Sequence, residues 1–167
     1  MSKVFYDKPI IDQIFKEFNK IKPEKKRLLN LVSRLPLEDI NKTDIVQETV
    51  LMLTIQYEFA FTCKCTEIVK LLLEKEGIDI NIKNKYGDTA LTQACYCYST
   101  ETVKLLLKHK DIDVNIQDND GKTALIIATE EEFTGAVKLL LEHKDIDVNV
   151  QNIYGNTALT YAPIVIE

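Results

Sequence analysis

The chain has 167 residues, a formal net charge of −5 and a hydrophobic content of 46%. This length suits a single domain, and the apolar content excludes a wholly disordered chain. The acidic balance argues against a nucleic-acid partner or an anionic membrane partner, because proteins that bind either one carry a basic surface. The sequence contains no run of about eighteen apolar residues, so we expect no membrane-spanning segment.

The N-terminal segment MSKVFYDKPIIDQIF has a short apolar core with acidic interruptions, which is not the pattern of a secretory signal. The four cysteines are therefore expected to be reduced thiols and not a disulfide framework. Together these features predict a cytoplasmic protein.

Two amphipathic helices are predicted within residues 8–36. Apolar residues at helical spacing mark one face of the first helix: Ile11, Ile14, Phe15 and Phe18. Pro23 opens the second helix, whose apolar face consists of Leu28, Leu29, Val32 and Leu35. We interpret this pair as a cap that covers the N-terminal end of the domain and occupies residues 1–38.

The rest of the chain is internally repetitive. The segment GDTALTQA begins at Gly87, GKTALIIA begins at Gly121 and GNTALTYA begins at Gly155, a constant spacing of 34 residues. The preceding segments IVKLLLEKEGIDIN, TVKLLLKHKDIDVN and AVKLLLEHKDIDVN keep the same register. A fixed period of this length is typical of repeat proteins, in which each unit packs against its neighbours.

Each unit is predicted to consist of a helix, a turn, a second helix and a hairpin-like loop. Val103, Leu106 and Leu107 form one apolar stripe at helical spacing. The polar segment 118–121 reads as a tight turn, because Asn, Asp and Gly tolerate left-handed backbone. Side-chain caps for the helices that carry the stripe are expected at Thr66, Thr100 and Thr134.

A degenerate repeat is predicted upstream, in residues 39–78. DINKTDIVQETVLMLT from Asp39 aligns with DVNIQDNDGKTALIIA from Asp113, and this register requires a six-residue extension between Thr49 and Val69. A second register pairs Ala60 with Ala94 and keeps the 34-residue step. The sequence leaves both registers open.

The units resemble ankyrin repeats, whose signature is T-P-L-H-x-A. Here the sequences Thr-Ala-Leu-Thr and Thr-Ala-Leu-Ile replace T-P-L-H, and Tyr98 and Glu132 replace the glycine that ends the family's inner helix. The style resembles ankyrin proteins of giant viruses, amoebae and intracellular bacteria. The resemblance implies an all-α solenoid in one domain, 1–167. Its expected parts are the cap 1–38, the degenerate repeat 39–78, full repeats 79–112 and 113–146, and a truncated repeat 147–167 whose helix ends at Pro163.

No catalytic constellation is evident. His109 and His143 occupy equivalent positions near helix C-termini, where a partial positive charge on the imidazole interacts favourably with the helix dipole. Consecutive carboxylates in the segment 130–132 diverge on a helix, so we expect them to face a basic partner and not to act as an acid and base pair. No phosphate loop, zinc-protease or nucleophile-elbow motif is present. We therefore expect no enzyme activity, no cofactor and no small-molecule substrate.

Two Cys-x-Cys pairs are the one alternative with metal or redox chemistry. Cys63 and Cys65, with Cys95 and Cys97, supply four thiolates that could bind zinc or respond to oxidation. Against this, a Cys-x-Cys spacing on a helix directs the two sulfurs about 200° apart. We predict no metal site.

The resemblance implies a protein-protein interaction module that acts as a scaffold, an adaptor or a host-directed effector. A regulatory inhibitor of a partner enzyme is the alternative. The compartment is then the cytoplasm, or the host cytosol for an effector or viral protein. Ankyrin repeats usually meet a partner protein on the concave side, at hairpin tips and inner-helix positions. The expected contact residues are Lys85, Tyr86, Asp88, Tyr96, Cys97, Asn119, Asp120, Lys122, Glu130, Glu131, Ile153, Tyr154 and Asn156.

Overall fold

The computed structural model describes residues 9–18, 20, 24–61 and 66–162. The predicted roles of Pro23 and Pro163 fall outside these residues. The helices in chain order are α1 (Ile10–Phe18), α2 (Lys25–Ser33), the 3-10 turn η1 (Leu37–Asp39), α3 (Val50–Phe61), α4 (Thr66–Leu73), α5 (Ala90–Tyr96), α6 (Thr100–Leu106), α7 (Ala124–Glu130), α8 (Thr134–Leu141) and α9 (Ala158–Tyr161).

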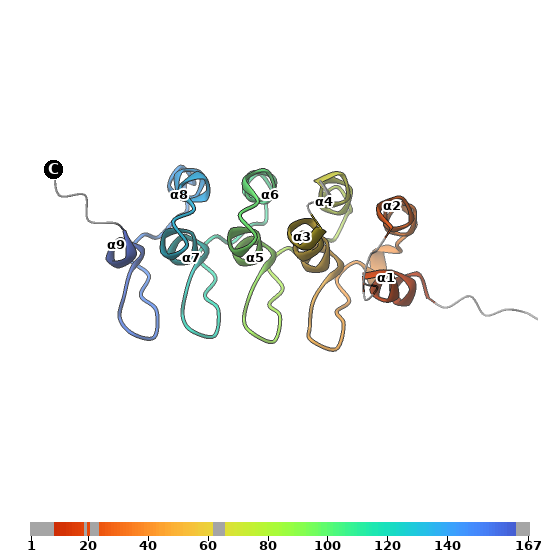
Figure 1. Cartoon of the computed structure of the whole chain (residues 1–167), viewed down its shortest axis with the longest axis horizontal. Coiled ribbons are helices and arrows are strands. Elements are labelled where there is room, and N and C mark those ends of the chain that lie inside the picture. Colours follow the sequence, from red (N-terminus) through yellow and green to blue (C-terminus); the bar gives the residue numbers. More distant parts are fainter. Residues whose placement is uncertain (1–8, 19, 21–23, 62–65, 163–167) are drawn as a thin grey trace, which may run out of the picture.

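The helices stand in two rows along an elongated molecule (Figure 1). An inner row contains α1, α3, α5, α7 and α9, and an outer row contains α2, α4, α6 and α8. Long hairpin-like loops project from the inner row, away from the outer row. The described residues form no strand beyond an isolated bridge between Thr43 and Thr49. The predicted all-α repeat architecture is confirmed.

Threonines cap the inner helices. Thr89 precedes α5 and accepts a hydrogen bond from the backbone N–H of Thr92, while the Thr92 hydroxyl accepts one from the N–H of Thr89. This reciprocal capping box satisfies amides that the first helical turn leaves without partners. Thr123 caps α7 by the first of these two bonds alone, because its side chain accepts the N–H of Ile126 and isoleucine has no acceptor to return one.

The predicted caps of the outer helices are wrong. Helices α4, α6 and α8 begin at Thr66, Thr100 and Thr134, so these threonines are the first helical residues and not the caps. Ser99 and Phe133 precede α6 and α8, and neither supplies a side-chain cap. The threonines therefore lie at the start of the predicted helices, inside the first turn and not before it.

Helices α5 and α7 end without glycine. Tyr98 and Glu132 adopt left-handed backbone, with φ of 51° and 53°. Around Glu132, its own N–H donates to Thr129 O and the N–H of Phe133 donates to Ala128 O, which is the Schellman arrangement of a helix end. The structure thus keeps the geometry for which the family normally uses glycine.

The hairpin loops stack directly on one another. In the loop before α5, Asn84 Oδ1 accepts hydrogen bonds from the N–H groups of Tyr86 and Asp88, both at 2.9 Å, and holds the turn closed. A Cβ on Gly87, whose φ is +84°, would lie 2.5 Å from the Asn119 nitrogen of the next loop. Glycine is therefore required for both the conformation and the close approach. The same acceptor position is filled by Asp44, Asp118 and Asn152 in the other loops.

The degenerate repeat adopts the first of the two registers. Asp44 and Thr49 occupy the places of Asn84 and Thr89, and Gln47, with φ of 63°, stands where Gly87 stands in the next loop. The extra residues lengthen the helix, because α3 has 12 residues and α5 has 7. The division of the chain into repeats stays a prediction.

Asparagines join each unit to the next. Asn81 Nδ2 donates to the carbonyl of Asp111 at 2.7 Å, and its Oδ1 accepts from the N–H of Asp113 at 3.0 Å. One side chain therefore pairs with both polar groups of the neighbouring loop. We call these contacts the asparagine bridges. The equivalent bridges join Asn41 to Gly77 and Asp79, and Asn115 to Asp145 and Asp147.

A continuous apolar core runs through the stack, and neighbouring units complete it. Leu125 of α7 is 2% exposed, whereas Leu159, its equivalent in α9, is 82% exposed. Val114 is likewise buried and its equivalent Val148 is exposed. A unit therefore buries its apolar face only where the next pair of helices covers it.

Replacing Leu106 by alanine is expected to lower the free energy of unfolding by about 2–5 kcal/mol, because this side chain is fully buried in α6 and its loss leaves a cavity. Lys104→Ala, on the exposed side of the same helix, is the matched control and is expected to change little. Urea denaturation measures both. Equal losses in the two variants would contradict the assigned core face.

Replacing Glu132 by glycine is expected to stabilise the protein by about 0.5–1 kcal/mol, because glycine adopts the left-handed backbone at this helix end without strain. Lys138→Gly, at an exposed position within α8, should instead cost about 1 kcal/mol. Thermal denaturation distinguishes the two signs. A destabilised Glu132→Gly variant would show that the Glu132 backbone is not strained.

Candidate partner-binding surface

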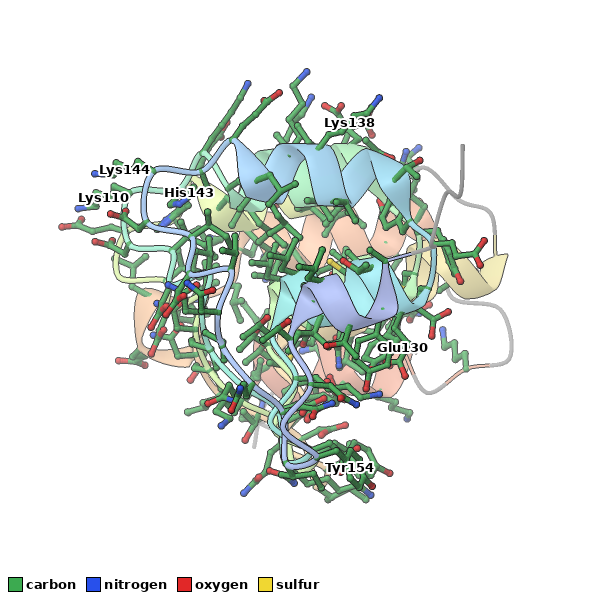
Figure 2. The ribbon with its side chains drawn as sticks, turned by 90° about the vertical axis from the view of Figure 1, so that its left-hand side faces the viewer. Lys110, Glu130, Lys138, His143, Lys144 and Tyr154 are labelled. Atoms are coloured by element: carbon green, nitrogen blue, oxygen red, sulfur yellow. The ribbon has the colours of Figure 1, made fainter. Side chains whose placement is uncertain are left out.

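The predicted contact residues of the hairpin loops lie at the loop tips. Tyr86, Ile153 and Tyr154 are all more than half exposed, and Lys85, Asn119 and Asp120 are exposed beside them. Figure 2 shows Tyr154 at the tip of its loop, at the end of the molecule away from Lys138 on the outer row. We call the loop tips and the adjoining exposed ends of the inner helices the candidate surface.

Backbone hydrogen bonds fix the spacing of these tips. The N–H of Asn119 donates to Tyr86 O at 3.0 Å, and the N–H of Ile153 donates to Asp120 O at 3.0 Å. The side chain of Asn119 adds a bond to the carbonyl of Lys85 at 3.0 Å. The tips therefore form one continuous strip, and a partner would meet a preformed surface and not separate flexible loops.

The inner helices contribute the second side of the candidate surface. Tyr96 is the last residue of α5 and is 37% exposed, and Cys97 follows it half-buried. At the end of α7, Glu130 forms an ion pair with Lys122 of the hairpin. Glu131 Oε2 accepts a 2.6 Å hydrogen bond from the hydroxyl of Tyr98, a residue that the sequence reasoning left out of the surface.

Two hollows lie between the hairpins and α5. The first, of about 230 Å³, is lined by side chains that include Glu48, Asn84, Gln93 and Tyr96. The second, of about 260 Å³, lies toward the next hairpin and includes Asp118 and Asp120 among its lining residues. Three residues line both hollows and separate them: Tyr86, Asp88 and Tyr96.

The electrostatic environment of the hollows is negative. Burial, and after it the negative charge of Asp118, raises the pKa of Asp88 above its ordinary value. Burial and the carboxylates of Asp118 and Asp88 also raise the pKa of Tyr96. Next to them, the hydrogen bond to Glu130 raises the pKa of Lys122, which holds its charge in that pair. The Lys85 ammonium lies 4.7 Å from the Tyr86 ring centroid, so this ring already faces a cation.

The structure groups the predicted residues unevenly. Tyr86, Asp88, Tyr96, Asn119 and Asp120 meet around the second hollow. By contrast, Glu130 is engaged by Lys122, and Glu131 by Tyr98.

The residues nearest the C-terminal end form a separate group. Ile153 and Tyr154 lie at the tip of the last described hairpin. The Asn156 amide nitrogen lies 3.3 Å from the hydroxyl of Tyr161, to which it donates. Whether this surface binds a partner stays a prediction.

Sequence reasoning missed Glu48 and Gln93. Glu48 precedes the cap Thr49, as Asp88 precedes Thr89, so the first of the two open registers aligns Glu48 with Asp88, which was among the expected contact residues. Gln93 lies within α5 at a position that the helical period assigns to the interior. The available signal was that the repeat aligns Gln93 with the apolar residue Ile127.

The described cysteines and histidines do not gather into a metal or redox site. Cys95 is buried and Cys97 half-buried, neither forms a disulfide with another described residue, and Cys63 and Cys65 lie outside the described residues. Within the described part of the chain, no group of three or more His, Cys, Asp or Glu side chains is arranged to hold a metal ion. His109 Nδ1 accepts the N–H of Asp111 in a surface turn, and His143 repeats this with Asp145.

The repeated helix pairs and stacked hairpins agree with the comparison to known families. A family model described as ankyrin repeats (3 copies) matches residues 24–118, 60–152 and 111–163. The chain belongs to the ankyrin-repeat family. Its members are generally protein-protein interaction modules and are typically not enzymes. A search of curated proteins finds no significant match to this chain. No helix in the described ranges is long and apolar enough to cross a bilayer.

The two described cysteines are expected to differ in reactivity. Burial raises the pKa of the Cys95 thiol to about 12, and the reactive thiolate is therefore scarce as well as inaccessible at pH 8. With an aromatic disulfide reagent and native protein, Cys95→Ala is expected to leave the number of reacting thiols unchanged. Cys97→Ser should lower that number by one. Loss of one reacting thiol in Cys95→Ala would contradict the burial of this side chain.

Proposed function

We propose that this chain is a protein-interaction module that holds a partner protein against the candidate surface. The observation that carries the proposal is the exposure of large side chains at the loop tips, among them Ile45, Tyr86, Ile153 and Tyr154. Tyrosine provides a large contact area at low entropic cost, which explains its frequency among the residues that dominate binding energy. The hydrogen-bonded strip of hairpins supports the same function, because it presents these residues in a fixed arrangement.

Within this function, a scaffold, an adaptor and a host-directed effector share one physical requirement, which is a surface that binds and leaves the partner active. A regulatory inhibitor would use the same surface to cover the partner's own site. The partner's activity, measured with and without saturating amounts of this chain, distinguishes the two roles. The sequence contains no recognisable catalytic constellation. We therefore propose that the chain affects its partner by steric contact.

Replacing Tyr86 or Tyr154 by alanine is expected to weaken partner binding by about 1–3 kcal/mol. Folding should change little, since both side chains are exposed and their hairpins are closed by backbone contacts. The partner is first obtained by affinity capture from the native cytosol and identified by mass spectrometry. Isothermal titration calorimetry then measures each variant.

Matched controls lie on the outer row. Lys104→Ala and Lys138→Ala change exposed side chains of α6 and α8 and should leave the affinity within experimental error. If the tyrosine variants bind normally while the outer-row variants lose binding, the partner is held on the opposite side of the molecule. The proposed surface would then be wrong.

A further inference from the structure

The first hollow contains a buried carboxylate whose charge is not balanced. Glu48 is 4% exposed and accepts hydrogen bonds from two neutral amides. Asn84 Nδ2 donates to its Oε1 at 2.8 Å, and Gln93 Nε2 donates to Oε1 and Oε2 at 3.1 and 2.9 Å. Among the described residues, no lysine, arginine or histidine forms an ion pair with Glu48. Burying a charge without an opposite charge is costly, so a cation that reached it would be bound with favourable energy.

A second polar group in the same hollow lacks a hydrogen-bond donor. Gln93 is 5% exposed, and its Oε1 is a buried acceptor that receives no hydrogen bond from any described residue. The amide nitrogen of Gln93 is committed to Glu48, which fixes Oε1 as the acceptor that remains. The residues that line the hollow therefore include two buried acceptors, the Glu48 carboxylate without an opposite charge and the Gln93 carbonyl oxygen without a donor.

The walls of the hollow suit a flat cation. Tyr96 contributes a half-exposed aromatic side chain, and Asp88 adds a further carboxylate at the boundary with the second hollow. An arginine guanidinium carries several donors in one plane, keeps its charge at every accessible pH and stacks on aromatic rings. A lysine ammonium has the same charge, but it is a compact group without a flat face that could stack on the Tyr96 ring.

We infer that the first hollow receives an arginine side chain from a basic segment of the partner protein, with the guanidinium donating to the acceptors of Glu48 and Gln93. This inference rests on the proposed interaction function and names the chemistry of the partner. It locates one contact within the candidate surface and one kind of side chain that occupies it.

The neighbouring repeats show that this feature is local. The position of Glu48 and Asp88 is filled by Lys122 in the next hairpin and by Asn156 in the last one. Lys122 is already paired with Glu130, so the equivalent place in that repeat contains its own cation. Among the described buried carboxylates, Glu48 is thus the one without an ion pair, and it lies where the first two hairpins meet.

The test uses N-acetyl-argininamide as the probe and its neutral analogue N-acetyl-citrullinamide as the control ligand. Each is titrated into the full chain labelled with ¹⁵N, and the side-chain amide signals of Gln93 and Asn84 are followed by NMR. We expect saturable shifts of these signals with the arginine probe and none with the citrulline analogue. Equal responses to both ligands, or no response to either, would overturn the inference.

Three variants locate the binding. Glu48→Gln and Asp88→Asn are each expected to weaken the arginine probe about tenfold, because a charge-assisted contact is lost. Asp111→Asn removes the same charge from an exposed loop on another part of the molecule and should leave the affinity unchanged. If Glu48→Gln disturbs the fold, as its amide spectrum would reveal, Asp88→Asn decides. Equal affinities in all three variants would also refute the inference.

The captured partner separates this inference from the proposed function. Weaker binding in both Tyr86→Ala and Glu48→Gln supports both. Weaker binding in Tyr86→Ala with full affinity in Glu48→Gln and Asp88→Asn retains the interaction surface and overturns the arginine contact. Full affinity in all of these variants overturns both.

Discussion

The structure depends on contacts that each unit makes with the next. The contrast between buried Leu125 and exposed Leu159 shows that the same residue at the same place in the repeat is in the core only when a neighbour covers it. The asparagine bridges add polar contacts between the same units, since Asn81 pairs with a carbonyl and an N–H of the neighbouring loop. Stability and shape are therefore properties of the interfaces between units.

The candidate surface follows from these same interfaces. Close stacking at Gly87 brings adjacent hairpins into hydrogen-bonding contact, and this places Tyr86 next to Asn119 and aligns the hollows beside α5. The cluster around Glu48 also crosses a unit boundary, because its donors Asn84 and Gln93 belong to the following hairpin and helix. The buried polar cluster around Glu48 is thus formed between units, and no single unit contains it.

The sequence predicted the repeat architecture because a period of 34 residues leaves little freedom in how the units stack. It also identified Tyr98 and Glu132 as replacements for a helix-ending glycine, and both have the left-handed backbone that this role requires. The threonine caps of the outer helices were predicted one residue too far along the chain, because a Thr before an apolar run marks either the cap or the first helical residue. Glu48 and Gln93 were missed for a different reason. Their significance lies in the pairing of one buried amide with one buried carboxylate across two units, and spacing along the chain does not encode such a distance.

The direction of the asparagine bridges has a consequence for the shape of the molecule. These hydrogen bonds run from loop to loop along the row of units. Bending the row would stretch or compress them all together, so the bonds set a preferred curvature and resist departure from it. A partner whose surface has a different radius would have to strain several bridges at once. The curvature of the row would then contribute to the choice of partner, together with the side chains of the surface. A substitution in a loop that makes no contact with the partner could alter that choice.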